Sequence, residues 1–383
     1  MSMDIVGGLG AFGGHLVGYI VPFLFVLTIV VFFHELGHFL VARWCGIKVL
    51  VFSIGFGPEI VGFYDRYGTR WKVSAVPLGG YVKFFGDENP ASVPDHEAAA
   101  EMTEAEKAVS FVHQKVAPRA AVVVAGPVAN FILAILIFAG VFMTVGKQTT
   151  SARVDAVQPA SAAQAAGFKP GDLVVAINGE TIDSFADMQR IVSVNAGEVL
   201  NIEVDRGGVH VTLKATPQLK ELKDAFGNKH RLGVLGISRS TAPGDIKTER
   251  MGPLKAVAEG ARETWFVVDR TLAYIGGVFA GREAADQLGG PIRIAQVSGE
   301  VASIGFVALI HLTAVLSVSI GLLNLFPIPL LDGGHLLFYA IEAIRGRPLS
   351  ERAQEVGFRI GLAIVVMLMI FATFNDILHL ATS

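Results

Sequence analysis

The chain has 383 residues, of which 52% are hydrophobic and only 17% are charged, and its mean hydropathy is +0.54. Soluble globular proteins carry about a quarter charged residues, so this composition favours a membrane protein. The formal net charge of −3 lacks the basic excess of a nucleic-acid-binding protein, and we expect no nucleic-acid partner. The single cysteine, Cys45, excludes an internal disulfide.

Four apolar segments are predicted to cross a lipid bilayer, whose core requires about 20 helical residues. The first segment, Gly18–Ala42, contains one charged residue, Glu35. Two further segments, Ala120–Val145 and Ile304–Leu331, contain no charged residue. The fourth, Ile360–Phe374, has 15 apolar residues and reaches spanning length only with flanks that include Arg359 and Asp376. No Lys or Arg precedes the first segment and no cleavage site follows it, so we expect it to remain in the mature protein.

The basic residues beside these segments predict the orientation of the chain. Lys and Arg near the ends of a span are retained on the cytoplasmic side of the membrane. The flanking basic residues are Arg43, Lys48, Lys115, Arg119, Arg345, Arg347 and Arg352. Arg43 and Lys48 follow the first span, Lys115 and Arg119 precede the second, and the three other arginines lie between the third and the fourth. Both termini and residues 146–303 are therefore expected on the extracytoplasmic side.

The connection between the first two spans, residues 49–119, has two parts. Trp71–Val76 and Gly80–Phe85 are short β-prone runs among glycines and prolines, and they predict β-hairpins near the membrane. Asp87–Lys107 is acidic and rich in Ala, Pro and Ser, which favours a solvated loop or a polar helix over a binding site.

Residues 151–238 have an ordinary soluble composition. The predicted elements are strands at Leu173–Ile177, Leu200–Val204 and Val209–Leu213 and a helix at Phe185–Val194. Within them, Ala165–Glu180 resembles the core signature of bacterial PDZ domains, and Asn178-Gly179 is a strong hairpin turn. PDZ domains bind extended peptides by adding a strand to a sheet edge. The alternative is a domain that only blocks access to the membrane-embedded part.

Residues 239–303 include a predicted amphipathic helix. Between Leu254 and Val278, apolar residues recur at steps of three and four, which places them on one helical face. Such a helix could lie on the membrane surface or cover the soluble domain, and either role is structural.

The first span contains the motif H-E-x-x-H as His34-Glu35-Leu36-Gly37-His38. Residues four apart on a helix face the same side, so the two imidazoles can share a metal ion. Glu35 projects beside them and could take a proton from a metal-activated water. Ionisable residues inside a span are costly and normally mark a functional site, although buried hydrogen-bonded histidines or a proton relay would also explain them.

A catalytic zinc site needs a third protein ligand. Asp332 follows the third span, where Pro327 and Pro329 break the helix and Gly333-Gly334 leave the backbone free to bend. By the predicted orientation, Asp332 lies at the same membrane depth as the histidines. His335 and His311 are alternatives, but the Asp332 carboxylate has the greatest need of a partner at that depth.

Four features together resemble the site-2 protease family, most closely the bacterial membrane-embedded zinc metalloproteases of regulated intramembrane proteolysis. They are H-E-x-x-H in the first span, Gly126-Pro-Val-Ala-Asn130 in the second, a single PDZ-like insert, and N-x-x-P-x-P-x-L-D-G-G from Asn324 to Gly334. Some relatives carry two tandem PDZ domains, whereas residues 146–303 hold one recognisable copy.

The resemblance implies a role for each matching residue. His34, His38 and Asp332 would bind Zn²⁺, and Glu35 would be the general base. Asn324 would bind the substrate backbone near the scissile bond, and Asn130 is a second candidate substrate-binding residue that would make a polar contact in the site. The alternative for Asn130 is close helix packing through Gly126. The Val73–Phe85 region resembles the membrane-associated β-loop of the family, whose edge pairs with an unwound substrate.

We therefore expect a polytopic α-helical membrane protein with about four transmembrane helices, a membrane-associated β-hairpin region and an inserted extracytoplasmic PDZ-like α/β domain. The expected divisions are 1–48, 49–119, 120–145, 151–238, 239–303, 304–335 and 336–383. The spans lie in 1–48, 120–145, 304–335 and 336–383. The H-E-x-x-H motif is in 1–48 and the L-D-G motif is in 304–335. The amphipathic helix lies in 239–303.

The expected function is zinc-dependent intramembrane endopeptidase activity in the bacterial inner membrane, with the active site toward the cytoplasm. As the resemblance implies, the substrates would be single-pass membrane proteins such as anti-sigma factors, already trimmed outside the membrane, and the PDZ-like domain would hold a peptide or a substrate segment. The alternative is a transporter that uses the intramembrane His, Glu and Asp as a relay, or a non-catalytic PDZ scaffold. The two hypotheses differ in whether Glu35 is required.

Overall fold

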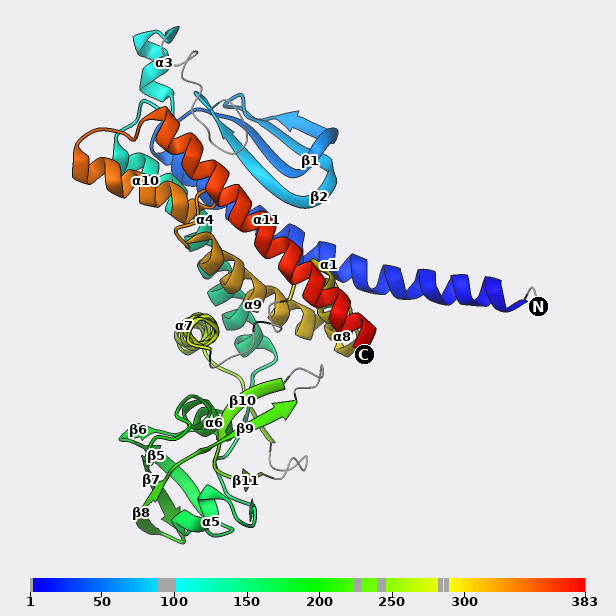
Figure 1. Cartoon of the computed structure of the whole chain (residues 1–383), viewed down its shortest axis with the longest axis vertical. Coiled ribbons are helices and arrows are strands. Elements are labelled where there is room, and N and C mark those ends of the chain that lie inside the picture. Colours follow the sequence, from blue (N-terminus) through cyan, green and yellow to red (C-terminus); the bar gives the residue numbers. More distant parts are fainter. Residues whose placement is uncertain are drawn as a thin grey trace. The chain divides into compact units, whose positions relative to one another are not determined.

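The computed structural model describes residues 3–87, 101–223, 229–239, 246–281, 285 and 289–382 (Figure 1). The chain forms two compact units. The first comprises Met1–Gly140, Val257–Ile275 and Ala285–Ser383, and the second comprises Val141–Ala256 and Gly276–Ala284. The acidic stretch predicted as a loop or polar helix falls largely outside the described residues, which resume at 101 and include a short helix, α3 (Glu104–Val109).

The first unit is mainly helical. Its other helices are α1 (Met3–Trp44), α4 (Val116–Thr144), most of α7 (Pro253–Phe279), α8 (Pro291–Ile304), α9 (Phe306–Asn324), α10 (Asp332–Arg345) and α11 (Glu351–Thr382). Four helices in the described part of the chain are long and apolar enough to cross a membrane, at Val17–Trp44, Val116–Thr144, Phe306–Asn324 and Glu351–Ala381. They overlap the four predicted segments and fit a polytopic helical membrane protein.

The predicted end of the third span is wrong by several residues. The apolar run continues to Leu331, but helix α9 ends at Asn324. A non-helical turn follows, in which Leu330 has a φ of 99°, and α10 begins at Asp332. The two prolines explain the early end, because proline cannot continue a helix and disfavours helical geometry in the residue before it. The L-D-G motif therefore starts a new helix instead of ending the span.

The predicted hairpin region is a sheet of two long antiparallel strands, β1 (Val49–Tyr64) and β2 (Arg70–Phe84). Both strands bend back on themselves, so that Phe52 pairs with Val82 on one side and with Trp71 on the other. Phe52 and Val82 are buried in a hydrophobic cluster with Phe39 of α1. This packing fixes the sheet against the helix that carries the H-E-x-x-H motif.

The turn between β1 and β2 is tied to the end of α1. Asp65 accepts hydrogen bonds from the indole of Trp71 and from the backbone amides of Tyr67 and Thr69, and it pairs with Arg43. Burial alone would raise the pKa of Asp65, but these hydrogen bonds outweigh it and lower the pKa to about 2. The carboxylate is therefore charged throughout the physiological range.

The second unit contains a four-stranded antiparallel sheet in the order β6-β5-β7-β8, with helices α5 (Ala162–Ala166) and α6 (Phe185–Val194). The four strands are β5 (Leu173–Ile177), β6 (Glu180–Thr181), β7 (Leu200–Arg206) and β8 (Val209–Ala215). The remaining strands pair as β3 (Lys147–Thr150) with β12 (Ile246–Glu249), β4 (Ala156–Val157) with β11 (Ile237–Ser238), and β9 (Gln218–Lys223) with β10 (Lys229–Val234). Val174, Ile202 and Val204 lie at the centre of its core.

Candidate metal centre

His34 and His38 occupy successive turns of α1 and point to the same side of the helix. Their Nε2 atoms are 3.2 Å apart, and their rings lie edge to face at 84°. Each residue is only 9% exposed. The spacing of four residues within a helix produces this arrangement, as the sequence predicted.

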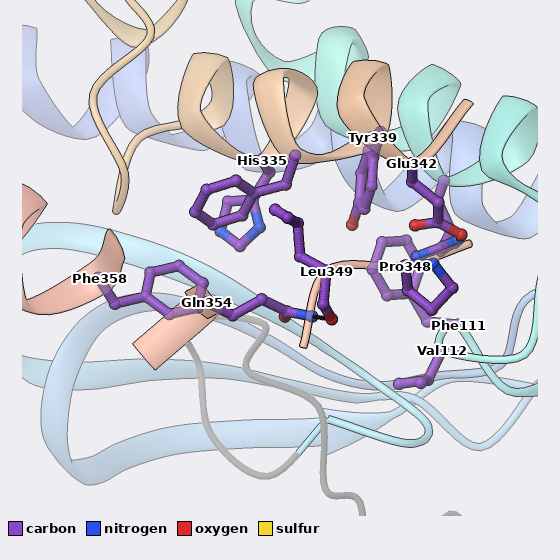
Figure 2. A pocket seen from close by; sticks show the side chains of 11 residues that line it. Phe111, Val112, His335, Tyr339, Glu342, Pro348, Leu349, Gln354 and Phe358 are labelled. Carbon is purple, nitrogen blue, oxygen red and sulfur yellow. Dashed lines mark hydrogen bonds and ion pairs between the residues drawn. The ribbon is translucent and has the colours of Figure 1, made fainter. Parts of the chain in front are cut away.

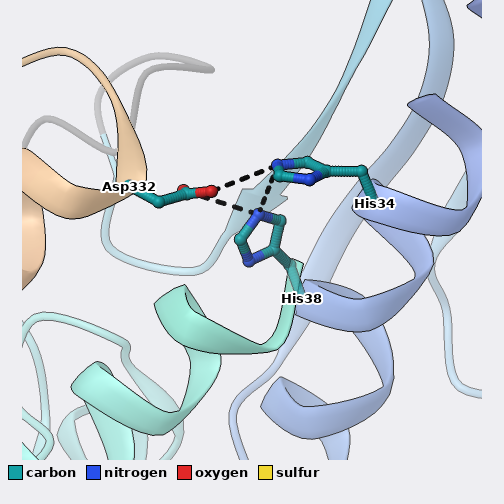
Figure 3. Close-up of side chains that lie close together, drawn as sticks. All are labelled: His34, His38 and Asp332. Atoms are coloured by element: carbon teal, nitrogen blue, oxygen red, sulfur yellow. Dashed lines mark hydrogen bonds and ion pairs between the residues drawn. The ribbon is translucent and has the colours of Figure 1, made fainter. Parts of the chain in front are cut away.

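Asp332 reaches the two histidines from the first residue of α10 (Figure 3). Its Oδ2 lies 3.1 Å from Nε2 of His34, and its Oδ1 lies 3.6 Å from Nε2 of His38. The turn before Asp332 is compact because Gly334 has no side chain. A Cβ at Gly334 would lie 2.5 Å from the Cα of Pro329. The glycine thus lets the chain reverse and present the carboxylate to α1.

The other ring nitrogen of each histidine, Nδ1, also has a polar partner. The Nδ1 of His38 lies 2.8 Å from the carbonyl oxygen of Val122, and the Nδ1 of His34 lies 3.3 Å from the amide nitrogen of Asn130. Both partners belong to α4. These contacts orient the rings so that both Nε2 atoms face Asp332, as outer partners of metal-binding histidines commonly do.

The donor set fits a metal ion. Among the described residues, His34, His38 and Asp332 form the group of His, Cys, Asp or Glu side chains that could hold one, with all ligand atoms within 4.8 Å of one another. Oδ2 of Asp332 is buried and has no hydrogen-bond partner in the described part of the chain, although it lies 3.1 Å from Nε2 of His34 in an ion pair. Two imidazole nitrogens and one carboxylate oxygen are a characteristic ligand set for catalytic zinc.

Two glycines allow α1 and α4 to approach closely at this point. A Cβ at Gly37 would contact the backbone oxygen of Ala125 and lie 2.8 Å from Cβ of Ala129. A Cβ at Gly126 would contact the ring of His38 and lie 3.0 Å from Cε1 of His34. Gly126 therefore makes space for the imidazoles themselves, whereas in the sequence it entered only through close helix packing, the alternative role for Asn130.

Glu35 lies between the histidines and strand β2. Its carboxylate accepts a hydrogen bond from the backbone amide of Val82 and interacts electrostatically with His38 and Asp332. The position of a Cβ at Gly80 would be 3.0 Å from Cγ of Glu35. The edge of β2 therefore contacts Glu35 directly, which the sequence did not indicate because residues 35 and 82 are far apart along the chain.

The two asparagines have different environments. Asn130 is fully buried against His34, whereas Asn324 is partly exposed at the last turn of α9. The side-chain amide of Asn324 donates to the carbonyl oxygen of Ile320 in its own helix, at 3.1 Å. The structure places Asn130 beside a histidine of the cluster, and no contact joins Asn324 to it among the described residues.

Among the described residues, the group that could hold a metal ion includes neither of the alternative histidines, His311 and His335. The ring of His311 packs on Phe138, with 5.1 Å between ring centroids. His335 lines a separate cavity of about 250 Å³, where Figure 2 shows it beside Phe358 at the opposite end from Glu342. In this cavity Glu342 forms an ion pair with Arg119 at 2.5 Å.

Comparison with known proteins agrees with this chemistry. The model of peptidase family M50 matches residues 22–368. A protein of Agrobacterium fabrum, whose name describes it as a candidate zinc metalloprotease, is 54% identical over 364 residues, covering 95% of this chain and 97% of the relative. The metalloprotease MmpA of Caulobacter vibrioides is 42% identical over 380 residues, covering 94% and 95%. A family match over most of the chain, with relatives aligned along nearly their whole length, shows that this chain belongs to peptidase family M50.

Proposed function

We propose that this peptidase is a zinc-dependent endopeptidase that hydrolyses peptide bonds of membrane proteins within or near a spanning segment. The convergence of His34, His38 and Asp332 in a bundle of helices apolar enough to cross a membrane carries this proposal. Relatives whose names describe zinc metalloproteases support the choice of metal.

Three of the four ionisable residues would bind the metal, and the fourth would transfer protons. His34, His38 and Asp332 would hold zinc, which when bound supplies a Lewis acid that activates water for attack on a carbonyl. Glu35 would take a proton from the attacking water and later deliver it to the leaving amine, as the peptide C–N bond breaks. Its electrostatic interaction with His38 and its hydrogen bond from the backbone amide of Val82 support this role.

The substrate must lose its helical hydrogen bonds before cleavage, because an intact helix hides its carbonyl groups. The stretch of β2 around Gly80 and Val82 pairs with β1 on one side and meets Glu35 on the other. We propose that an unwound substrate segment is held as an added strand near this edge. Asn324, which is partly exposed at the end of α9, would contact the substrate backbone.

We further propose that substrates are single-pass membrane proteins, such as anti-sigma factors trimmed beforehand outside the membrane. The second unit would act as a PDZ domain that holds or filters them, a proposal supported by its Ala165–Glu180 sequence and its antiparallel sheet. The basic residues beside the spans favour an inner-membrane protein with this unit outside the cytoplasm and the cluster toward the cytoplasmic side.

Cleavage of a tagged single-pass substrate by purified full-length protein tests the proposal. We expect Glu35→Gln to retain zinc and lose cleavage, and Asp332→Ala to lose both. Glu355→Gln, which removes a carboxylate from the exposed Arg359 pair of α11, is the matched control and should cleave normally. Equal cleavage by wild type and Glu35→Gln, or a wild type without zinc, would favour a relay or a scaffold instead.

A further inference from the structure

Asn130 contacts His34 through a side-chain amide, a group that can both donate and accept a hydrogen bond. It is 0% exposed, and its Nδ2 lies 3.3 Å from Nδ1 of His34. The other end of the amide, Oδ1, is buried and has no hydrogen-bond partner in the described part of the chain. A buried amide oxygen without a partner is unfavourable, so this amide has reason to adopt its second orientation.

The orientation of the amide is linked to the position of the proton on His34. When Asn130 donates through Nδ2, Nδ1 of His34 accepts, and the proton of the neutral ring is on Nε2. A metal ion on Nε2 requires this proton to be on Nδ1 instead. Nδ1–H then needs an acceptor, and within the described residues the amide of Asn130 is the only polar group bonded to that nitrogen.

The other histidine has no such choice. Nδ1 of His38 faces the backbone carbonyl of Val122 at 2.8 Å, and a carbonyl can only accept. The ring of His38 is thereby fixed with Nδ1 protonated and Nε2 free to bind. The two zinc ligands proposed on α1 therefore differ in how their tautomers are set.

We propose that Asn130 is a positioning residue for His34, which binds metal with the oxygen of the Asn130 amide accepting a hydrogen bond from Nδ1–H. Metal binding at Nε2 and a half-turn of the amide are then coupled. This inference rests on the proposed zinc site. In this proposal Asn130 acts on His34 and not on the substrate. The complete burial of Asn130 argues against the direct substrate contact expected from the sequence.

Helix α9 holds Asn130 in place without restricting its amide. The hydroxyl of Ser317 donates to the backbone oxygen of Asn130 at 2.9 Å. Gly321 allows close packing, since a Cβ there would lie 3.1 Å from Cβ of Asn130. These contacts reach the backbone and Cβ, so rotation about the last side-chain bond remains possible.

Zinc affinity of the full-length protein in detergent, measured by competition with a chromophoric chelator, tests the proposal. Asn130→Leu removes the acceptor and should raise the zinc Kd by about 10- to 100-fold. Asn130→Asp supplies an acceptor that cannot donate and should keep the Kd close to the wild-type value. Ser317→Ala removes a hydrogen bond to the same residue without altering the amide, and its Kd should also stay close to wild type.

Nitrogen-15 spectra of histidine-labelled, zinc-loaded protein give a readout that a purely structural role would not change. His34 should show a protonated Nδ1 in wild type and in Asn130→Asp. An unchanged zinc Kd in Asn130→Leu would overturn the proposal, as would an Asn130→Asp variant as weak as Asn130→Leu. If Asn130→Leu does not fold, Asn130→Ala answers the same question without added bulk. A wild type that binds no zinc would instead reject the zinc site itself.

Discussion

At the scale of single residues, the site depends on a glycine, Gly126, as much as on the three proposed ligands. Gly126 lies where any larger residue would meet both imidazoles. Gly140, on the same helix α4, has no atom within 4 Å of the position that its Cβ would take. The two glycines therefore provide a matched comparison between a site residue and an open position.

We predict that Gly126→Ala impairs catalysis while Gly140→Ala does not. The new methyl group would lie 2.5 Å from Cε1 of His38 and force that ring to move. A displacement of about 1 Å at a reacting group can reduce a rate by about 100-fold. Zinc content and substrate cleavage should both fall in Gly126→Ala, and comparable values for the two variants would contradict the prediction.

The three proposed zinc ligands could be predicted from the sequence, whereas the groups that contact them could not. His34 and His38 are predictable because an i, i+4 pair shares a helix face, and Asp332 because a carboxylate at membrane depth needs a partner. Val122 contributes only a backbone carbonyl, which no side-chain pattern can reveal. Gly126 and Asn130 are also four residues apart, so their common helix face was the available signal for a shared role beside the histidines.

At the scale of elements, a carboxylate of the last helix caps another helix. Asp376 of α11 is 2% exposed and accepts hydrogen bonds from the backbone amides of Gly290, Ile292 and Arg293 at 2.8 to 3.1 Å. These amides start α8, where they have no partner inside the helix. The contact joins two elements that the sequence analysis treated as a connector and a separate span.

Removal of this cap should destabilise the first unit. Asp376→Ala leaves three backbone amides without their acceptor, and the loss of a helix cap typically costs about 1 to 2 kcal/mol. We expect a lower thermal unfolding midpoint and faster hydrogen exchange at the start of α8. Glu355→Ala, which removes an exposed carboxylate from the same helix, should remain near wild type. Unchanged exchange in α8 would show that other contacts hold it.

The sheet of the second unit has its own buried charge. Asp172 is 0% exposed and bonds Nε and Nη2 of Arg206 at 2.7 and 2.8 Å, and the backbone amide of Lys169 donates to it. The hydrogen bonds from Arg206 hold the pKa of Asp172 below its usual value. The folded state therefore favours the carboxylate, and its stabilising effect is complete above the usual carboxyl range and is lost as the pH falls through the lowered pKa.

Arg206→Gln should lower the free energy of unfolding of this unit by about 3 kcal/mol at pH 7, because a buried carboxylate loses its partner. The difference from wild type should shrink as the pH falls from 7 toward 3, since protonation removes the charge in both proteins. Hydrogen exchange of β5 and β7 in the full chain measures both effects. Arg190→Gln, which breaks the more exposed ion pairs with Glu180 and Asp187, is the control. A difference that grows with acidity would refute this account.

At the scale of the whole molecule, the chain divides into two units with separate cores, and the three residues proposed to bind zinc all belong to the first. A ligand that binds only the folded state stabilises the part of the protein that forms its site, by about 2.7 kcal/mol at 100 times its Kd. Chelation of zinc should therefore speed hydrogen exchange in α1, α4 and α10 and leave β5, β7 and β8 unchanged. Equal acceleration in both units would show that their stabilities are coupled.

The sequence by itself determined the apolar segments, the positions of several strands and helices, and the ionisable residues placed where lipid should exclude them. These are local properties, set by hydropathy, periodicity and the cost of a charge inside a membrane. Only the tertiary structure decided that β2 lies against Glu35, that Gly126 makes space for the two imidazoles, and that Asn130 contacts His34. Each of these depends on contacts between distant parts of the chain, where packing and hydrogen bonding override local preference.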